Sequence, residues 1–195
     1  MKIYQQKTIA TRRPRLTPGY GGRMKALLVA LALIAGAATP IFAQSEDGIK
    51  SAFLYNFGKF TEWPATAFAG ASAPITVGFV GSDTLADLFE KNVTGKSANG
   101  HDFAVKKLPT AAGVEACQIV IIGDEAQLAA VFAAIKGKSI LTVGESAAFG
   151  TAGGIIKFYR DGAKVAFDVD LDAAKNVQLK LDSKLLKIAK NVKGG

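Results

Sequence analysis

Apolar residues recur along the chain with two periods, and these periods predict where helices and strands lie. The stretch from Ile49 to Trp63 has the helical period, so we predict one amphipathic helix there. Its apolar stripe consists of Ile49, Phe53, Phe57 and Phe60. Pro64 disfavours helical geometry at the residue before it, which places the expected end of the helix near Trp63.

Further along, short runs of β-branched and apolar residues predict strands, and helical segments that end at glycine lie between them. The expected order is strand Ile75–Val80, helix Asp83–Val93, strand Asp102–Leu108, strand Ile119–Ile122, helix to Ile135, strand Ser139–Val143, hairpin Ile155–Tyr159 with Lys164–Val169, helical turn Asp170–Lys175 and helix Ser183–Val192. Two strand–helix–strand units predict a single α/β domain with a mainly parallel, Rossmann-like sheet. A C-terminal antiparallel hairpin and a terminal helix complete it. The two units are similar in register, either through an internal repeat or because glycine caps are common.

The net charge of +8 comes almost entirely from the first part of the chain. Residues 1–43 contain seven of the 24 Lys and Arg residues and none of the 16 Asp and Glu residues, so residues 44–195 have a net charge of only +1. Proteins that bind nucleic acids need a basic surface that neutralises phosphates, and the predicted domain lacks such an excess of positive charge. We therefore expect no nucleic-acid partner.

Residues 24–43 have the three parts of a secretory signal peptide. Met24-Lys25 is a short basic start, the run from Ala26 to Ala38 is apolar, and Ala43 is a small residue at a suitable cleavage position. The apolar run is shorter than the roughly 20 residues of a membrane span, so we expect translation from Met24, cleavage after Ala43 and a periplasmic domain. The pair Arg12-Arg13 is typical of a twin-arginine signal, which is the alternative route of export.

Residues typical of catalysis or metal binding are few and scattered. The Gly-Lys-Ser tripeptides at Gly95 and Gly137 follow predicted helices and lack the first glycine of a phosphate-binding loop. His101, the sole histidine, is predicted to lie in a solvated turn, which leaves no zinc site and no Ser–His–Asp triad. Cys117, the sole cysteine, is predicted to be a buried thiol, with an intermolecular disulfide as the alternative. We therefore predict a non-enzymatic protein without a cofactor or a metal.

Three loops with polar residues each follow a predicted parallel strand, so they should meet at the carboxyl edge of the sheet. Their polar residues are Ser82, Asp83, Asp124, Glu125, Glu145 and Ser146. Open α/β folds bind ligands at this edge, and the acids would favour an amine or a cation. The alternative is that these residues cap helix N-termini, which prefer the same residue types.

The end of the first predicted helix is the second candidate surface. It contains Phe60, Glu62, Trp63 and Pro64. The apolar stripe of the helix is best explained as part of the core. The aromatic side chain that leaves the helix next to proline would help to form a recognition surface for a protein partner.

A series of motifs spans the chain from Ile49 to Val192 in a fixed order. The motifs are Ala52-Phe53-Leu54-Tyr55-Asn56-Phe57-Gly58-Lys59-Phe60 with Glu62-Trp63-Pro64, Cys117 before its strand, Leu141-Thr142-Val143, Gly153-Gly154-Ile155-Ile156, Val169-Asp170-Leu171-Asp172-Ala173-Ala174 and Leu179-Lys180-Leu181-Asp182-Ser183-Lys184-Leu185-Leu186. Together they resemble the YfiR family of exported regulatory proteins. The first and last motifs are the most specific, because they are long and lie in the right order.

The resemblance implies a periplasmic α/β domain, often a homodimer, without enzymatic activity. The better-understood members bind the periplasmic sensor region of a membrane diguanylate cyclase and hold it inactive, which lowers cyclic di-GMP and restrains biofilm formation. A membrane sensor kinase is the other kind of partner. Some members have paired cysteines, whereas Cys117 is single here, so regulation through an internal disulfide does not apply. The competing hypothesis is a small-ligand receptor that uses the carboxyl edge.

Overall fold

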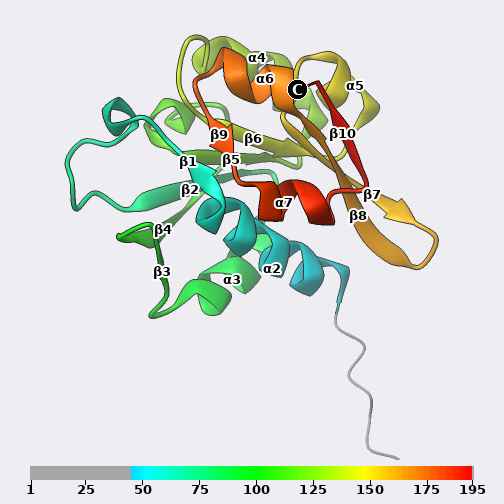
Figure 1. Cartoon of the computed structure of the whole chain (residues 1–195), viewed down its shortest axis with the longest axis horizontal. Coiled ribbons are helices and arrows are strands. Elements are labelled where there is room, and N and C mark those ends of the chain that lie inside the picture. Colours follow the sequence, from blue (N-terminus) through cyan, green and yellow to red (C-terminus); the bar gives the residue numbers. More distant parts are fainter. Residues whose placement is uncertain (1–44, 195) are drawn as a thin grey trace, which may run out of the picture. The chain divides into compact units, whose positions relative to one another are not determined.

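The computed structural model describes residues 45–194 (Figure 1). The predicted start at Met24, the Arg12-Arg13 pair and cleavage after Ala43 all concern residues outside this range. Within it, no helix combines the length and the apolar character that a membrane span requires.

An eight-stranded sheet runs through the domain in the order β10-β8-β7-β6-β5-β2-β4-β3. Its strands are β2 (Ile75–Val80), β3 (Ser97–Ala98), β4 (His101–Leu108), β5 (Ile119–Ile122), β6 (Leu141–Gly144), β7 (Ile156–Asp161), β8 (Lys164–Asp170) and β10 (Asn191–Lys193). The strands from β7 to β4 are mutually parallel, β8 and β3 are antiparallel to their inner neighbours, and β10 is parallel to β8. The prediction of a mainly parallel α/β sheet with a C-terminal hairpin is therefore confirmed.

Helices cover both faces of this sheet (Figure 1). The helices are α2 (Glu46–Lys59), α3 (Asp83–Val93) and α7 (Ser183–Ile188) on one face, α4 (Leu128–Ala134) and α5 (Ala147–Thr151) on the other, and α6 (Leu171–Asn176) directly after β8. In β5, Ile119 and Ile121 pack into the cluster beside α2 and α3, whereas Val120 and Ile122 pack into the cluster beside α4 and α5. Burial on both faces explains why the inner strands are continuous apolar runs.

The first helix differs from its predicted extent at both ends. Ser45 caps its N-terminus, and the helix ends at Lys59 instead of reaching Trp63. One residue later, Thr61–Glu62 forms the strand β1, which pairs antiparallel with β9 (Lys180–Leu181). These strand hydrogen bonds require an extended backbone, so pairing with the C-terminal part of the chain ends the helix before the proline does.

The buried side of α2 is centred on Phe57, which has no exposed surface. Its ring centroid lies 5.5 Å from that of Phe158 and 4.9 Å from that of Phe167. The other three residues of the predicted stripe are half-buried. Gly58 allows close approach to the sheet, because a Cβ there would lie 2.7 Å from Cε1 of Phe103.

The end of the chain contains the second departure from prediction. The helix α7 ends at Ile188, so the expectation of a helix to Val192 is wrong. Its cap is Asp182 instead of Ser183. The next residues form β10, in which Val192 pairs with Val169 of β8. The edge of β8 would otherwise present unpaired backbone groups, and β10 satisfies them.

Cys117 is a buried thiol, as predicted. It is 2% exposed, and its sulfur packs where a Cβ on Gly78 would lie, 2.8 Å from that position. Burial raises the pKa of Cys117 to about 11. The thiol therefore stays protonated near neutral pH, which makes it a weak nucleophile and a packing residue.

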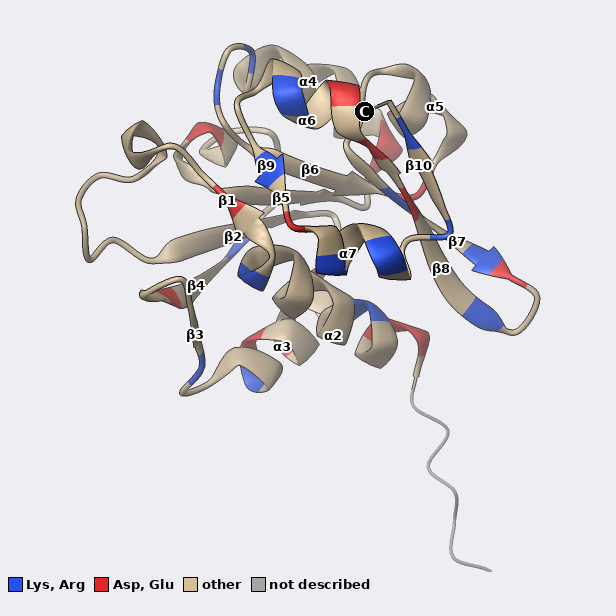
Figure 2. Cartoon of the chain, in the orientation of Figure 1, with Lys and Arg blue, Asp and Glu red and all other residues tan. Residues whose placement is uncertain are grey.

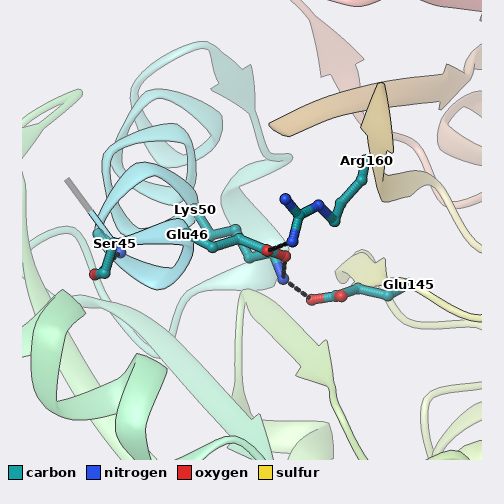
Figure 3. Close-up of polar contacts among 6 residues, drawn as sticks. Ser45, Glu46, Lys50, Glu145 and Arg160 are labelled. Carbon is teal, nitrogen blue, oxygen red and sulfur yellow. Dashed lines mark hydrogen bonds and ion pairs between the residues drawn. The ribbon is translucent and has the colours of Figure 1, made fainter. Parts of the chain in front are cut away.

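A cluster of charged residues joins the first turn of α2 to the sheet (Figure 3). The Nζ of Lys50 lies 2.8 Å from Oε1 of Glu46 and 2.7 Å from Oε1 of Glu145, which follows β6. Arg160 of β7 adds a bond of 3.2 Å from its Nη1 to Oε2 of Glu46. Because the Lys50 side chain is only 8% exposed, its charge is largely removed from water and depends on these carboxylates.

The pKa shifts of this cluster follow from its geometry. Burial alone would lower the pKa of Lys50, but the bonds to Glu145 and Glu46 outweigh burial and raise it above 10.5. The bond from Lys50 lowers the pKa of Glu46 below 4.5. The ion pair therefore contributes its full stabilisation of the folded state between the ordinary pKa values of the two groups, 4.5 for Glu46 and 10.5 for Lys50. It is lost as the pH falls through the folded-state pKa of Glu46 or rises through that of Lys50.

We expect Lys50→Met to lower the free energy of unfolding by about 1–2 kcal/mol near neutral pH, because Glu46 and Glu145 lose their shared cation while the apolar stem remains. Urea denaturation measures this loss. The difference from the unchanged protein should shrink in acid as Glu46 becomes protonated. Lys187→Met, on an exposed lysine of α7, is the matched control. A loss that does not change with pH would contradict the ion-pair explanation.

Candidate functional site

The carboxyl ends of β2, β5 and β6 surround a pocket of about 360 Å³. It is lined by Gly81, Ser82, Ile122, Gly123, Glu125, Leu128, Glu145, Ser146 and Phe149. All three predicted loops contribute to it, because parallel strands place the loops after them at one edge of the sheet.

The structure brings together four of the six polar residues predicted for this edge: Ser82, Glu125, Glu145 and Ser146 line the pocket. The other two, Asp83 and Asp124, are not part of its lining. The carboxylate of Asp124 instead accepts a hydrogen bond of 2.9 Å from the backbone N–H of Ala126. Asp124 thus caps the short 3-10 turn before α4, which is the alternative function expected for such residues.

Two glycines allow these loops to approach each other. A Cβ on Gly123 would lie 1.9 Å from Oγ of Ser82, closer than any two such atoms can come. Gly81 has a φ of +72°, and a Cβ there would lie 2.5 Å from Cβ of Asp124. The narrow floor of the pocket therefore requires glycine at both positions.

Some polar groups of the pocket already form ion pairs or hydrogen bonds within the protein, and others do not. Glu145 is bound by Lys50, and the hydroxyl oxygen of Ser146 accepts a hydrogen bond of 3.1 Å from the N–H of Phe149. Ser82 makes no capping bond with its side chain, and Glu125 forms no ion pair among residues 45–194. The pocket is thus less acidic than the sequence indicates. Its uncompensated charge is the carboxylate of Glu125, which fits an amine.

Metal binding has no support in the described part of the chain. Across residues 45–194, no three His, Cys, Asp or Glu side chains lie together in a way that could hold a metal ion. Basic and acidic residues are interspersed over the elements visible in Figure 2. The polar groups that line the pocket are carboxylates and hydroxyls, which can form ion pairs and hydrogen bonds.

The second predicted surface follows the end of α2. Glu62 is exposed, whereas Phe60 is half-buried with the Nζ atoms of Lys59 and Lys184 at 5.5 and 6.0 Å from its ring centroid. Trp63 is half-buried. Its indole N–H donates to a backbone oxygen inside the domain, so this side chain is fixed by the fold before any partner arrives.

Gln118 organises this region, and sequence analysis did not single it out. Its backbone oxygen accepts the 3.3 Å bond from Nε1 of Trp63. Its side-chain oxygen accepts a 2.8 Å bond from the N–H of Thr76, and its side-chain nitrogen donates a 2.7 Å bond to the oxygen of Ala67. No local sequence signal could reveal this, because all three partners lie far away along the chain.

His101 is also placed differently from the prediction of a solvated turn. It begins β4, is half-buried, and stacks on Phe68 with ring centroids 4.1 Å apart and planes 4° from parallel. Its Nδ1 lies 2.6 Å from the backbone oxygen of Ala73. Together, Gln118 and His101 fix the loop of residues 65–73 beside Trp63.

Two solved structures match this chain only distantly. A conserved domain protein from Vibrio cholerae O1 biovar El Tor has a TM-score of 0.46 and 12% identity, over 61% of this chain and 55% of that one. The ABC domain from Streptococcus pneumonia in complex with L-Trp has a TM-score of 0.45 and 10% identity, over 66% and 57%. The chain thus spans little more than half the length of either. None of the curated proteins compared with the chain matches it.

The sequence profile of a protein family gives the more informative comparison. The family with the description YfiR/HmsC-like (DUF4154) matches residues 47–190, from the first turn of α2 to the residue before β10. This match includes the aromatic helix, the Trp-Pro segment and the C-terminal motifs. It supports a regulatory role. The chain belongs to the YfiR/HmsC-like family.

Proposed function

We propose that this chain is a non-enzymatic periplasmic regulator that binds the periplasmic sensor region of a membrane diguanylate cyclase and represses it. Repression would lower cyclic di-GMP and restrain biofilm formation. The family match over residues 47–190 is the observation that carries this proposal, because it covers nearly all of the described domain. A homodimer is part of the same proposal, since members of the family are often dimeric.

Repression of this kind requires a difference in affinity between two states of the partner. If the chain binds the inactive sensor region more tightly than the active one, it shifts the population towards the inactive state, and by no more than that difference. A rigid contact surface favours such discrimination, because little ordering free energy is lost on binding. The segment after α2 has this property, since Gln118 and His101 hold it in place.

Within that segment, we place the partner contact at Glu62 and at the exposed part of Phe60. Glu62 is exposed and lies in β1, where the backbone is fixed by pairing with β9. Trp63 and Pro64 then position the contact. Trp63 serves this purpose through its bond to Gln118 and its edge-to-face contact with Phe68, at 6.3 Å between centroids.

Deletion of the gene should raise cellular cyclic di-GMP and increase biofilm mass, because the cyclase would lose its repressor. Nucleotide extraction with mass spectrometry measures the first effect, and expression of the chain in the deletion strain should reverse both. If cyclic di-GMP stays unchanged and no membrane protein co-purifies with the chain, the proposal is wrong.

Glu62→Arg should weaken repression while leaving the free energy of unfolding within about 0.5 kcal/mol of its original value, because the side chain is exposed. Glu90→Arg, at another exposed acid on α3, should leave repression intact.

Trp63→Ala should instead lower the free energy of unfolding by about 2 kcal/mol, since a half-buried aromatic ring and its hydrogen bond are lost. Full repression by Glu62→Arg would exclude this surface as the contact.

Binding of a small amine is a second candidate function, and it fits the pocket at the carboxyl edge of the sheet. The observation that favours it is the carboxylate of Glu125, which lines the pocket with Ser82 and forms no ion pair within residues 45–194. Amine binding would also provide a signal that releases the partner.

A thermal-shift panel of amines should show at least one saturable stabilisation that Glu125→Gln abolishes. Asp83→Asn should retain it, because Asp83 lies at the same edge without lining the pocket. A shift that survives Glu125→Gln would place the amine elsewhere.

A further inference from the structure

A separate pocket of about 370 Å³ lies between α5 and the strands β7, β8 and β10. It is on the same face of the sheet as α4 and α5, beside the hairpin and the C-terminal strand seen in Figure 1. Neither the family match nor the carboxyl-edge pocket accounts for it. Apart from Thr151 of α5, its polar residues come from three neighbouring strands, and its apolar residues come mainly from α5 and the residues that follow it.

One row of polar side chains crosses the three strands. Lys157 of β7 is the register partner of Asp168 in β8, and Asp168 is the register partner of Asn191 in β10. Asp168 is already engaged, because its Oδ1 accepts hydrogen bonds from the hydroxyl of Tyr159 at 3.0 Å and from Nδ2 of Asn191 at 2.8 Å. Lys157 faces Asp168 without forming an ion pair to it or to any other acid among residues 45–194.

The second acid of the pocket is also engaged. The Oδ2 of Asp170 lies 2.9 Å from Nζ of Lys193, and its Oδ1 accepts a hydrogen bond of 2.9 Å from the N–H of Ala173. The bonds to Ala173 and Lys193 outweigh burial and lower the pKa of Asp170. The carboxylate therefore stays ionised and paired near neutral pH. Lys157 is thus the one cation in the pocket lining that forms no ion pair within the described residues.

The remaining wall of the pocket is apolar and open. Ala147 and Ile155 line it, and Gly150 faces the stem of Lys157, with 3.6 Å between its ideal Cβ position and Cδ of the lysine. A short hydrocarbon group would displace water from this wall and gain free energy in proportion to the area that it buries.

We propose that this pocket binds a small organic monoanion, with its carboxylate on Nζ of Lys157 and its hydrocarbon part against α5. A monoanion fits better than a dianion. Lys157 offers a single ammonium group that is not in an ion pair, and a second negative charge would face the carboxylates of Asp168 and Asp170. The C-terminal strand β10 forms one wall, so a bound anion would also hold the end of the chain in place.

The proposal is tested by NMR titration of the purified protein with butyrate and benzoate. Saturable shifts are expected at the amides of Lys157, Asp168 and Asn191, with a dissociation constant on the order of 1 mM or below. Inorganic phosphate should bind at least about tenfold more weakly. Equal binding of phosphate would overturn the monoanion assignment, and the absence of saturable shifts would overturn the site.

Three variants separate the site from general attraction of anions. Lys157→Met should weaken binding about tenfold or more, because one charge-assisted hydrogen bond is lost. Gly150→Leu should block binding without changing any charge, because it fills the apolar wall. Lys164→Met, an exposed lysine at the start of β8 outside the pocket, should bind as the unchanged protein does. Retained binding in both Lys157→Met and Gly150→Leu would place the anion elsewhere.

Discussion

The ring of Phe57 packs against Phe158 and Phe167, and through this contact the first helix of the domain covers a hairpin formed near the other end of the chain. The rest of the fold depends on this burial. It holds α2 against this face of the sheet, and Gly58 allows the helix to lie close to Phe103. The same packing places Lys50 at the carboxyl edge of the sheet, where it forms an ion pair with Glu145. It also places the Trp-Pro segment at the opposite edge, where Trp63 donates a hydrogen bond to the backbone oxygen of Gln118.

The charges of the domain are arranged so that most buried or half-buried groups have a partner. Lys50 binds two acids, Asp168 accepts two hydrogen bonds, and Asp170 binds a lysine and a backbone amide. In the two pockets, the carboxylate of Glu125 and the ammonium group of Lys157 have neither an ion pair nor a side-chain hydrogen bond within the part of the chain that the structure describes. They lie in pockets on either side of α5 and have opposite charge. A helix of only five residues thus separates sites that would select ligands of opposite sign.

The fold could be predicted from the sequence because hydrophobic period reports burial directly, and the parallel inner strands are buried on both faces. The two largest errors in element boundaries arise where long-range pairing overrides local preference. Thr61–Glu62 forms a strand because it pairs with β9, and Asn191–Lys193 forms a strand because it pairs with β8. The residues around each segment do not indicate that such a partner strand exists.

The candidate site was predictable only in part, for a similar reason. The three loops after the parallel strands do meet, because topology decides this, and Ser82, Glu125, Glu145 and Ser146 line one pocket. That Glu145 would be neutralised by Lys50 depends on how α2 is packed, which the sequence does not reveal. Gln118 is a polar residue before a strand, and nothing in the neighbouring sequence indicates that its side chain is buried and hydrogen-bonded instead of exposed to solvent.

Because Phe57 is covered by residues of β7 and β8, the first helix lacks part of its partner surface until nearly the whole chain has been made. A chain that emerges from its N-terminus first would carry α2 with an exposed aromatic side through most of synthesis. Such long-range contacts also slow folding, since a large loop must close before they form. The contacts that bury Phe57 can therefore form only after β7 and β8 have been made. For the periplasmic function proposed above, this delay would help to keep the chain extended for passage through a membrane channel.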